Sequence, residues 1–459
     1  MWKTFRLLQN RTSAITQRLD RDRVNTDLKK FDLGRDNSLV SDRQEKSWQK
    51  VDWLRAQDGL NFFDDQTYHF QTLRALGDIP YGGADTSEVI ETISQIKVGN
   101  ADSWSDAWEH TGNRVLELAQ RSHDPISCGR AYLRAYNYYR TAEFFLEPHD
   151  PRRLNSTKKG VAAFYEALDI LSVKYERIRV PYGLHHLNAL YFQGSEGSEK
   201  RPLITICGGF DSTLEELYFI LVAAGLERGY SVLAYEGPGQ GSILREQGLP
   251  FTYEWEKPTC AVLDQYLQKH APPAKLVLVG MSMGGFLAPR ATAFDNRIDG
   301  VVAYDVFYDF GAIASRSVPP IALWFDRHRL GFLLDVIFKI KSAFSPGLKW
   351  AIQNSMWAMG TPDLHSTLRG YKAYTLEGVA QRITCDVLIL AGADDHFVPI
   401  EQVKQFENSL TQARSVTSVI YDRESGGGEH CQVGAATLWH ATFFDWLLRK
   451  FPTHTGPLQ

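Results

Sequence analysis

The pattern of apolar and polar positions changes near residue 175 of this chain. Before that point, apolar residues recur at helical spacing, as Trp104 and Trp108 do, and Asp150-Pro151 marks a break between two such runs. We therefore interpret residues 1–175 as a helical region that forms a layer on the rest of the protein, and not as an independent enzyme.

From about Tyr175 onward, short apolar runs alternate with helical patterns. The middle runs are continuously apolar and bounded by Gly or Pro, as expected of strands buried on both faces. This alternation predicts an α/β fold over residues 176–459, with a mostly parallel, doubly wound sheet. The predicted strands are Tyr175–Val180, His186–Phe192, Leu203–Cys207, Ser231–Tyr235, Lys275–Val279, Gly300–Tyr304, Asp386–Ala391 and Ser418–Asp422. Predicted helices include Leu214–Gly229, Pro258–His270 and Gly284–Phe294.

Residues 306–384 interrupt this alternation, because they contain no convincing strand and are rich in aromatic side chains. The stretch predicts a helical cap inserted between two strands, placed where it could cover an apolar pocket. For any single aromatic residue, ordinary packing of the added helices is the alternative. The aromatic residues are Trp324, Phe325, Phe332, Phe338, Phe344, Trp350 and Trp357.

Charge and hydropathy narrow the classes of partner. The formal net charge of −4 gives no reason to expect nucleic acid or an anionic membrane surface as a partner. The longest apolar run, Leu330–Ile340, is far shorter than the ~20 residues that a membrane span needs. We therefore predict no membrane-spanning segment and no nucleic-acid partner.

Cysteine usage and the N-terminus bear on the compartment. The five cysteines are scattered and contain no CxxC pair, which argues against a disulfide framework or a zinc-ribbon site and favours a reducing, cytoplasmic location. The first 19 residues carry Lys3, Arg6, Arg11 and Arg18 without an acidic residue, the composition of a mitochondrial transit peptide. A basic amphipathic first helix is the other interpretation.

The clearest chemical signal is Ser282, in the run Gly280-Met281-Ser282-Met283-Gly284. A predicted strand precedes this run and a predicted helix follows it, which is the context that a G-x-S-x-G nucleophile elbow requires. Serine is a weak nucleophile at its free pKa, so Ser282 also needs a base and a site for the developing negative charge. We expect Ser282 to be the nucleophile.

The negative charge calls for an oxyanion hole made of backbone N–H groups. In this kind of site the residue after the nucleophile supplies one donor, here Met283, and a loop after an earlier strand supplies the other. Gly208-Gly209-Phe210 follows the predicted strand Leu203–Cys207, and its glycines allow a close backbone approach. We expect Phe210 to be the second donor.

An acid and a base follow Ser282 in the order that a serine triad of this type requires. Asp394 and Asp395 come just after a predicted strand, and adjacent side chains cannot both point the same way; we favour Asp395, with Asp394 as the alternative. His430 ends a glycine-rich loop before the final helical pattern and is the expected general base.

Two further features of the sequence bear on the site. Asp305 and Asp309 follow the predicted strand Gly300–Tyr304, and either could enter the site as an auxiliary acid, or could start a cap helix or lie on the surface. The glycine-rich run Tyr235–Ser242 lacks the endings and spacings of nucleotide-binding loops. We expect no cofactor and no metal.

Together these residues resemble the α/β-hydrolase branch typified by 2,6-dihydroxypseudooxynicotine hydrolase and the FrsA-like proteins. The resemblance rests on five motifs and covers about residues 175–450, so 176–459 is expected to form an α/β-hydrolase core. The matching motifs are Cys207–Thr213, Tyr235–Gly241, the Ser282 elbow, Gly392–Pro399 and Gly428-Glu429-His430. The branch includes C–C bond hydrolases and is similar to fungal enzymes that tailor polyketides; it also implies a helical part near the active site and frequent homodimers.

The leading hypothesis is therefore a serine hydrolase that cleaves a C–C, ester or related acyl bond of a medium-sized carbonyl compound, in fungal secondary metabolism by the resemblance. An acyltransferase or cyclase that uses the same three residues is the first alternative. A non-catalytic, FrsA-like binding protein is the second.

Overall fold

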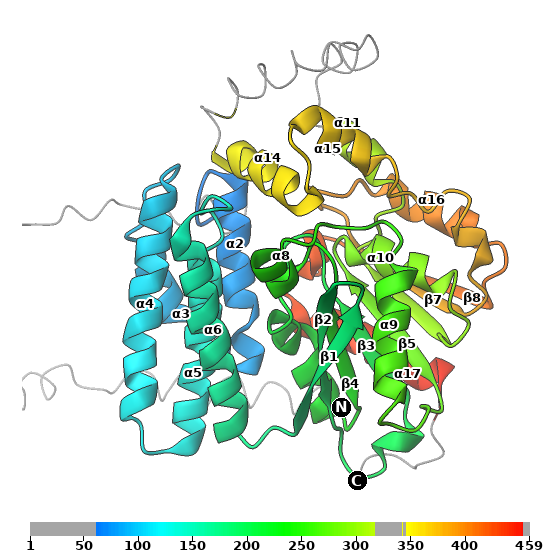
Figure 1. The fold of residues 1–459 in the computed structure, drawn as a ribbon, viewed down its shortest axis with the longest axis horizontal. Coiled ribbons are helices and arrows are strands. Elements are labelled where there is room, and N and C mark those ends of the chain that lie inside the picture. The colour runs from blue at the N-terminus through cyan, green and yellow to red at the C-terminus, as the bar shows by residue number, and fades with distance from the viewer. Residues whose placement is uncertain (1–60, 317–341, 343–345, 453–459) are drawn as a thin grey trace, which may run out of the picture. The chain divides into compact units, whose positions relative to one another are not determined.

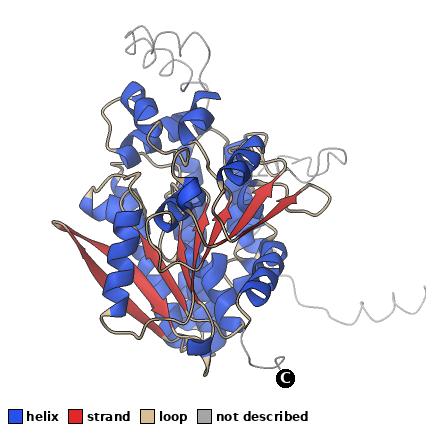
Figure 2. Ribbon diagram, turned by 90° about the vertical axis from the view of Figure 1, so that its right-hand side faces the viewer, coloured by secondary structure: helices blue, strands red, loops and turns tan. Residues whose placement is uncertain are grey.

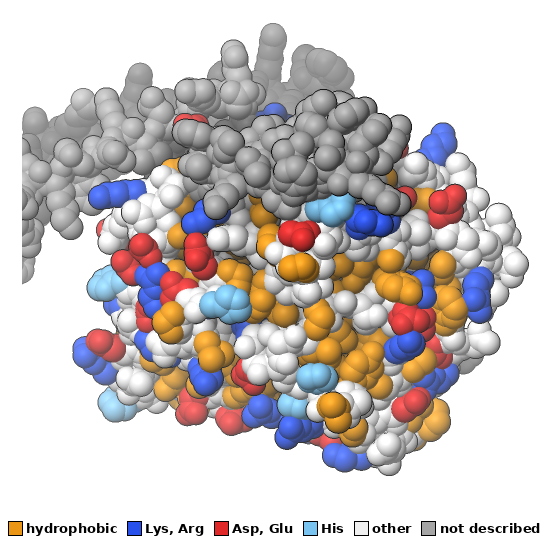
Figure 3. Space-filling view, turned by 45° about the horizontal axis from the view of Figure 1, so that its top comes forward, with side chains coloured by type: hydrophobic (Ala, Val, Ile, Leu, Met, Phe, Trp, Pro, Cys, Tyr) orange, Lys and Arg blue, Asp and Glu red, His pale blue; other side chains and the backbone are white. Residues whose placement is uncertain are grey.

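The computed structural model describes residues 61–316, 342 and 346–452. The predictions for the basic N-terminus, for the run Leu330–Ile340 and for most of the cap aromatics lie outside these residues; Trp350 and Trp357 lie within them. None of the described helices combines the length and the apolar character that crossing a bilayer requires. On the face seen in Figure 3, charges of both signs are interspersed over the described surface.

The described part of the N-terminal region is helical, and its helices stand side by side along one flank of the sheet (Figure 1). Their starts are marked by polar caps: the Asp65 side chain accepts hydrogen bonds from the backbone N–H groups of Thr67 and Tyr68, and Asp150 caps the helix after the predicted break. These elements are α2 (Gln66–Gly77), η1 (Ile79–Tyr81), α3 (Thr86–Ile93), α4 (Ala101–Arg121), α5 (Pro125–Ala142) and α6 (Pro151–Ile170).

An eight-stranded sheet follows, in the order β1-β2-β4-β3-β5-β6-β7-β8. The pairs from β4 through β8 are parallel, as predicted, whereas β2 pairs antiparallel with both β1 and β4. The turn between β1 and β2 is too short for the crossover that parallel pairing needs, which explains why these two strands are antiparallel. The strands are β1 (Tyr175–Tyr182), β2 (His185–Phe192), β3 (Leu203–Cys207), β4 (Val232–Glu236), β5 (Leu276–Met281), β6 (Gly300–Tyr304), β7 (Asp386–Gly392) and β8 (Ser415–Tyr421).

Helices cover both faces of this twisted sheet (Figure 2). In β5, Leu276 and Leu278 enter one buried apolar cluster while Val277 and Val279 enter the other, because successive strand side chains point to opposite faces. Because both faces of such a strand are buried, its sequence is a continuous apolar run. The covering helices are α7 (Ala223–Glu227), α8 (Gly241–Gln247), α9 (Glu256–Leu267), α10 (Gly284–Thr292), α16 (Glu401–Ser409) and α17 (Ala436–Lys450).

One predicted helix is partly a π-helix instead of a regular α-helix. The run Leu214–Gly229 contains a π-helical turn, η3 (Tyr218–Val222), which continues into the short helix α7. Over so few residues, apolar spacing does not distinguish a π turn from an α turn, so the pattern predicted one regular helix.

The insertion between β6 and β7 is helical in its described part and lies above the sheet (Figure 1). Here α14 lies close to α2, and the Trp350 ring stacks on Phe144 of the N-terminal region with ring centroids 4.3 Å apart. The insertion and the N-terminal helices therefore meet. The described elements are α11 (Phe310–Arg316), α14 (Pro346–Met359), α15 (Leu364–Tyr371) and η4 (Ala380–Arg382), together with an isolated bridge between Asp309 and Thr375.

Candidate active site

Ser282 lies in the tight turn between β5 and α10, with a positive φ of 58°. A non-glycine residue rarely adopts this backbone conformation, and its presence here matches the strained turn of a nucleophile elbow. A Cβ on Gly280 would lie 1.9 Å from the carbonyl oxygen of Gly284, and one on Gly285 would lie 1.6 Å from that of Asp305. The turn therefore depends on Gly285, which the motif does not include, as well as on Gly280.

The structure brings His430 and Asp395 to this serine. His430 follows β8 and is 3% exposed; its Nε2 atom lies 2.8 Å from the Ser282 Oγ atom, and its Nδ1 atom lies 2.6 Å from the Asp395 Oδ2 atom. His430 is thus hydrogen-bonded on both ring nitrogens, between a hydroxyl and a carboxylate. This is the arrangement in which a histidine takes a proton from a serine.

Asp395, and not its neighbour Asp394, faces the ring. The backbone N–H groups of Phe397 and Val398 donate to the Asp395 Oδ1 atom at 2.7 and 2.8 Å, which leaves Oδ2 for His430. Asp394 is exposed, and its N–H donates to the carbonyl of Gly428. The two aspartates of this turn therefore face different surroundings.

The electrostatics of this pair favour a charged imidazole ring. Burial disfavours the protonated form of His430, but the adjacent Asp395 carboxylate outweighs it and raises the pKa of His430 well above its usual range. Burial raises the pKa of Asp395, yet the His430 charge and the hydrogen bonds hold it below its ordinary value. The Asp395 carboxylate therefore favours the protonated form of the His430 ring.

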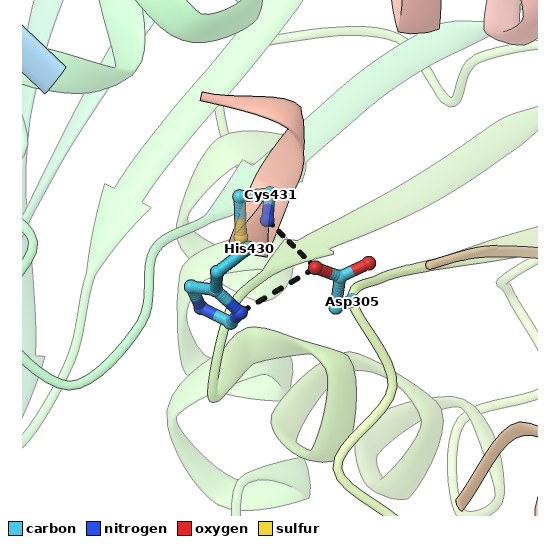
Figure 4. A group of neighbouring side chains, drawn as sticks. All are labelled: Asp305, His430 and Cys431. Atoms are coloured by element: carbon cyan, nitrogen blue, oxygen red, sulfur yellow. Dashed lines mark hydrogen bonds and ion pairs between the residues drawn. The ribbon is translucent and has the colours of Figure 1, made fainter. Parts of the chain in front are cut away.

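Of the two candidates for an auxiliary acid, Asp305 approaches His430. It lies just after β6 and is 1% exposed; its Oδ2 atom lies 3.4 Å from the His430 Nδ1 atom and accepts a hydrogen bond from the Cys431 N–H at 2.6 Å (Figure 4). Burial and the nearby Asp395 raise the pKa of Asp305 to about 8. Asp309 instead caps the start of α11, since its Oδ1 atom accepts from the Ala312 N–H at 2.8 Å.

The ligand atoms of Asp305, His430 and Cys431 lie within 4.8 Å of one another, close enough to hold a metal ion. The donor chemistry fits poorly. Burial raises the pKa of the Cys431 thiol, whereas a metal ligand is a thiolate, and the His430 Nδ1 atom already contacts Asp395. We interpret the cluster as a hydrogen-bond network that positions His430.

The loop after β3 lies directly against the serine. A Cβ on Gly209 would lie 2.7 Å from the Ser282 Cβ atom, so only glycine fits there. Among the described residues, no protein group accepts a hydrogen bond from the N–H of Phe210 or of Met283, the two expected oxyanion donors. Both remain available to a bound oxyanion.

Sequence reasoning missed the side chain that supports this loop. The Gln240 Nε2 atom donates to the carbonyl oxygens of Gly208 and Gly209 at 2.7 and 3.0 Å, and Gln240 is 1% exposed. It belongs to the glycine-rich run Tyr235–Ser242, whose place after a strand was the available signal. The run supports a neighbouring loop and does not resemble a phosphate cradle.

A cavity of about 220 Å³ opens at Ser282 and His430. Its wall near the histidine is aromatic: the ring centroids of Phe397, Phe307 and Phe70 lie 5.1, 6.0 and 6.1 Å from that of His430. Phe70 comes from α2, and Trp350 of α14 also lines the cavity. The N-terminal helices and the insertion therefore both contribute to the site, a contribution that helical spacing alone could not assign.

Comparison with known proteins identifies the family of the chain. A model described as "Alpha/beta hydrolase family" matches residues 205–431. The hydrolase acrC of Aspergillus aculeatus is 34% identical over 429 residues, which cover 87% of this chain and 100% of that protein. The 20-hydroxy-prefusarin hydrolase FUS2 of Gibberella moniliformis is 32% identical, over 85% of this chain and 97% of its own length.

Solved structures show the same fold. The crystal structure of 2,6-dihydroxy-pseudo-oxynicotine hydrolase superposes with a TM-score of 0.65 at 21% identity, over 82% of this chain and 95% of that one. AbyA5 superposes with a TM-score of 0.59 at 16% identity, over 83% and 95% of the two chains. The sequence relatives are 34% and 32% identical to this chain over 87% and 85% of its length. The chain therefore belongs to the alpha/beta hydrolase family and is a hydrolase of that fold.

Proposed function

We propose that this protein is a serine hydrolase in which Ser282 attacks the carbonyl carbon of a medium-sized substrate. The observation that carries the proposal is the pair of hydrogen bonds of His430, at 2.8 Å to the Ser282 Oγ atom and at 2.6 Å to the Asp395 Oδ2 atom. A buried imidazole that bridges a hydroxyl and a carboxylate is poised for proton transfer.

In the first half of the reaction, the Ser282 Oγ atom forms a bond to the carbonyl carbon while its proton passes to the His430 Nε2 atom. The N–H groups of Phe210 and Met283 hold the oxyanion. Collapse of this intermediate expels the leaving group, which takes the proton from His430. Water, deprotonated by His430, then attacks the acyl-enzyme and releases a carboxylic acid and free Ser282.

The bond cleaved is a C–C bond next to a ketone, or an ester or related acyl bond. Both share the first step, and they differ in whether a carbon, an oxygen or a nitrogen leaves with the proton. The nearness of Asp305 to His430 supports an extra acid in this proton transfer. A relative named for hydrolysing 20-hydroxy-prefusarin supports a role in fungal secondary metabolism.

A fluorophosphonate probe tests the nucleophile. We expect covalent labelling of the full chain, and no labelling of Ser282→Ala. The matched control is Ser409→Ala, whose hydroxyl bonds Tyr308 and the Gln405 carbonyl outside the cavity; it keeps its labelling. Absence of labelling in the folded wild-type protein would instead favour the non-catalytic binding protein.

Acyl transfer by the same residues is the second candidate. The aromatic wall around His430 favours it, because a site that excludes water while admitting an alcohol or amine passes the acyl group to that nucleophile. Product analysis with and without an added alcohol separates the two reactions. Only free acid in both cases supports hydrolysis, and an ester product supports transfer.

We also propose a cytoplasmic, homodimeric protein that binds no nucleic acid. The five cysteines, all free in the structure, support a reducing compartment. Fractionation of cells that express the full chain and a variant lacking its first 19 residues tests the compartment against the mitochondrial alternative. Light scattering on the purified protein tests the dimer.

A further inference from the structure

The face of α2 that lines the cavity is polar beyond Phe70. Gln71, Arg74 and Asp78 all line the cavity that contains Ser282. They lie three or four residues apart, the spacing that places side chains along one stripe of a helix and its C-terminal cap. The cavity therefore has an aromatic wall beside His430 and a polar wall formed by α2.

The charges on this polar wall cancel. The Arg74 guanidinium contacts the Asp211 carboxylate at 2.7 Å and the Glu216 carboxylate at 2.6 Å, and Arg140 contacts Glu216 at 2.9 Å. Two guanidinium groups thus face two carboxylates. Arg74 is committed to these partners, so the wall offers a ligand no net positive charge.

Asp78 lies beside this ion-pair network, near enough for the charges of Glu216 and Arg74 to act on its carboxyl group. It is 5% exposed and lines the cavity. Burial, together with the nearby Glu216 charge, raises the pKa of Asp78 well above its usual range. A neutral carboxyl group is both a hydrogen-bond donor and an acceptor.

Gln71 lies on the same wall of the cavity. It is 2% exposed, and its Oε1 atom makes no hydrogen bond with any described residue. Buried polar groups are nearly always hydrogen-bonded, because an unmet donor or acceptor is costly away from water. The unmet Gln71 acceptor lies on the same cavity wall as the Asp78 carboxyl group, which indicates that something other than the protein satisfies it.

We propose that Gln71 and Asp78 form a polar subsite that binds an uncharged substituent of the substrate carrying both a donor and an acceptor, such as an amide or a hydroxyl group. This inference rests on the proposed function of Ser282, because the subsite would hold the substrate whose carbonyl Ser282 attacks. The balanced charges around Arg74 disfavour a carboxylate, a phosphate or an ammonium group at the same place.

The test compares alkyl fluorophosphonates of equal chain length that end in a methyl, a carboxamide, a hydroxyl or a carboxylate group. The measured quantity is the second-order rate of Ser282 labelling, expressed relative to the methyl-ended probe for each protein. We expect the wild type to prefer the carboxamide or hydroxyl probe on the order of tenfold, and to discriminate against the carboxylate.

In Gln71→Leu and Asp78→Leu we expect the labelling rate of the carboxamide or hydroxyl probe, divided by that of the methyl probe, to fall toward one. Leucine can neither donate nor accept a hydrogen bond. Asp78→Asn keeps an uncharged donor and acceptor and is expected to retain it. Should Asp78→Leu fail to fold, by its circular dichroism and melting temperature, Gln71→Leu and Asp78→Asn still decide the question. The ratio within each protein cancels any general loss of reactivity.

Failure of this inference and failure of the proposed function have different signatures. Equal labelling by the methyl, carboxamide and hydroxyl probes, or a preference that survives in Gln71→Leu, overturns the subsite and leaves the nucleophile intact. Fastest labelling by the carboxylate probe also overturns it, in favour of an anion site at Arg74. No labelling by any probe overturns the proposed function itself.

Discussion

The Asp305 carboxylate lies 3.4 Å from the Nδ1 atom of His430, on the side of the ring that already contacts a second aspartate. Two acids of different character therefore face one nitrogen. Asp395 carries a pKa below its ordinary value and is ionised at neutral pH, whereas the pKa of Asp305 is raised to about 8 and its carboxyl group is largely neutral there.

The different pairing of the two neighbouring aspartates predicts opposite results for two matched substitutions. In Asp395→Asn, the His430 Nδ1 atom loses the carboxylate that holds its tautomer, and we expect kcat for a nitrophenyl ester to fall on the order of 10⁴-fold. Asp394→Asn changes an exposed side chain and should remain close to wild type. Comparable losses in the two variants would contradict the assignment of the acid.

Asp305 predicts a pH effect on the reactivity of Ser282. Below about pH 8 its carboxyl group is neutral; above that pH it ionises and adds a negative charge that favours the protonated form of His430. The wild type therefore needs a higher pH than Asp305→Asn to present a neutral base. The pH dependence of fluorophosphonate labelling should shift to lower pH in Asp305→Asn, and an unchanged profile would count against this coupling.

The same residue predicts how stability depends on pH. The folded state keeps the proton of Asp305 up to about pH 8, whereas the unfolded chain releases it near the ordinary value of 3.8. Raising the pH between these values therefore favours unfolding, and the effect is absent below the lower value. Across this range, the melting temperature of Asp305→Asn should increase relative to that of the wild type as the pH rises. A constant difference would contradict the prediction.

Gly209 predicts a steric loss of activity. The added methyl group of Gly209→Ala would lie 2.7 Å from the Ser282 Cβ atom and 3.0 Å from its Oγ atom, so the loop or the serine must shift. A displacement of this kind costs on the order of 10²-fold in rate. The control is Gly160→Ala in α6, where the nearest atom is 3.4 Å away, an ordinary contact. Esterase assays on both variants decide the point, and a fully active Gly209→Ala protein would refute it.

Gln240 predicts a milder loss through the same loop. In Gln240→Leu the carbonyl groups of Gly208 and Gly209 lose their donor, so the backbone that presents the Phe210 N–H is held less firmly. We expect kcat to fall on the order of tenfold with KM little changed, because the oxyanion forms only in the transition state. Gln268→Leu, a change at the exposed residue that directly follows α9, serves as the control. A rise in KM alone would point to a role in substrate binding instead.

Local patterns in the sequence were sufficient to predict the strands of the sheet and to nominate the candidate catalytic residues. Strands buried on both faces read as unbroken apolar runs, so β3 and β6 were predicted to the residue. The nucleophile turn was visible because its glycines, its strand and its helix are adjacent in the chain. The predicted order of serine, acid and histidine could be read because each of the three comes after a predicted strand of its own.

Only the tertiary structure decided which distant groups meet. His430 is 148 residues from Ser282, and whether Asp395 or Asp394 turns toward it depends on the backbone of one short loop. In the sequence, the polar stripe of α2 is an ordinary amphipathic pattern. Only the structure shows that this stripe lines the cavity. Spacing along the chain reports which face of an element is buried; what that face is buried against is set by the packing of segments far apart in sequence.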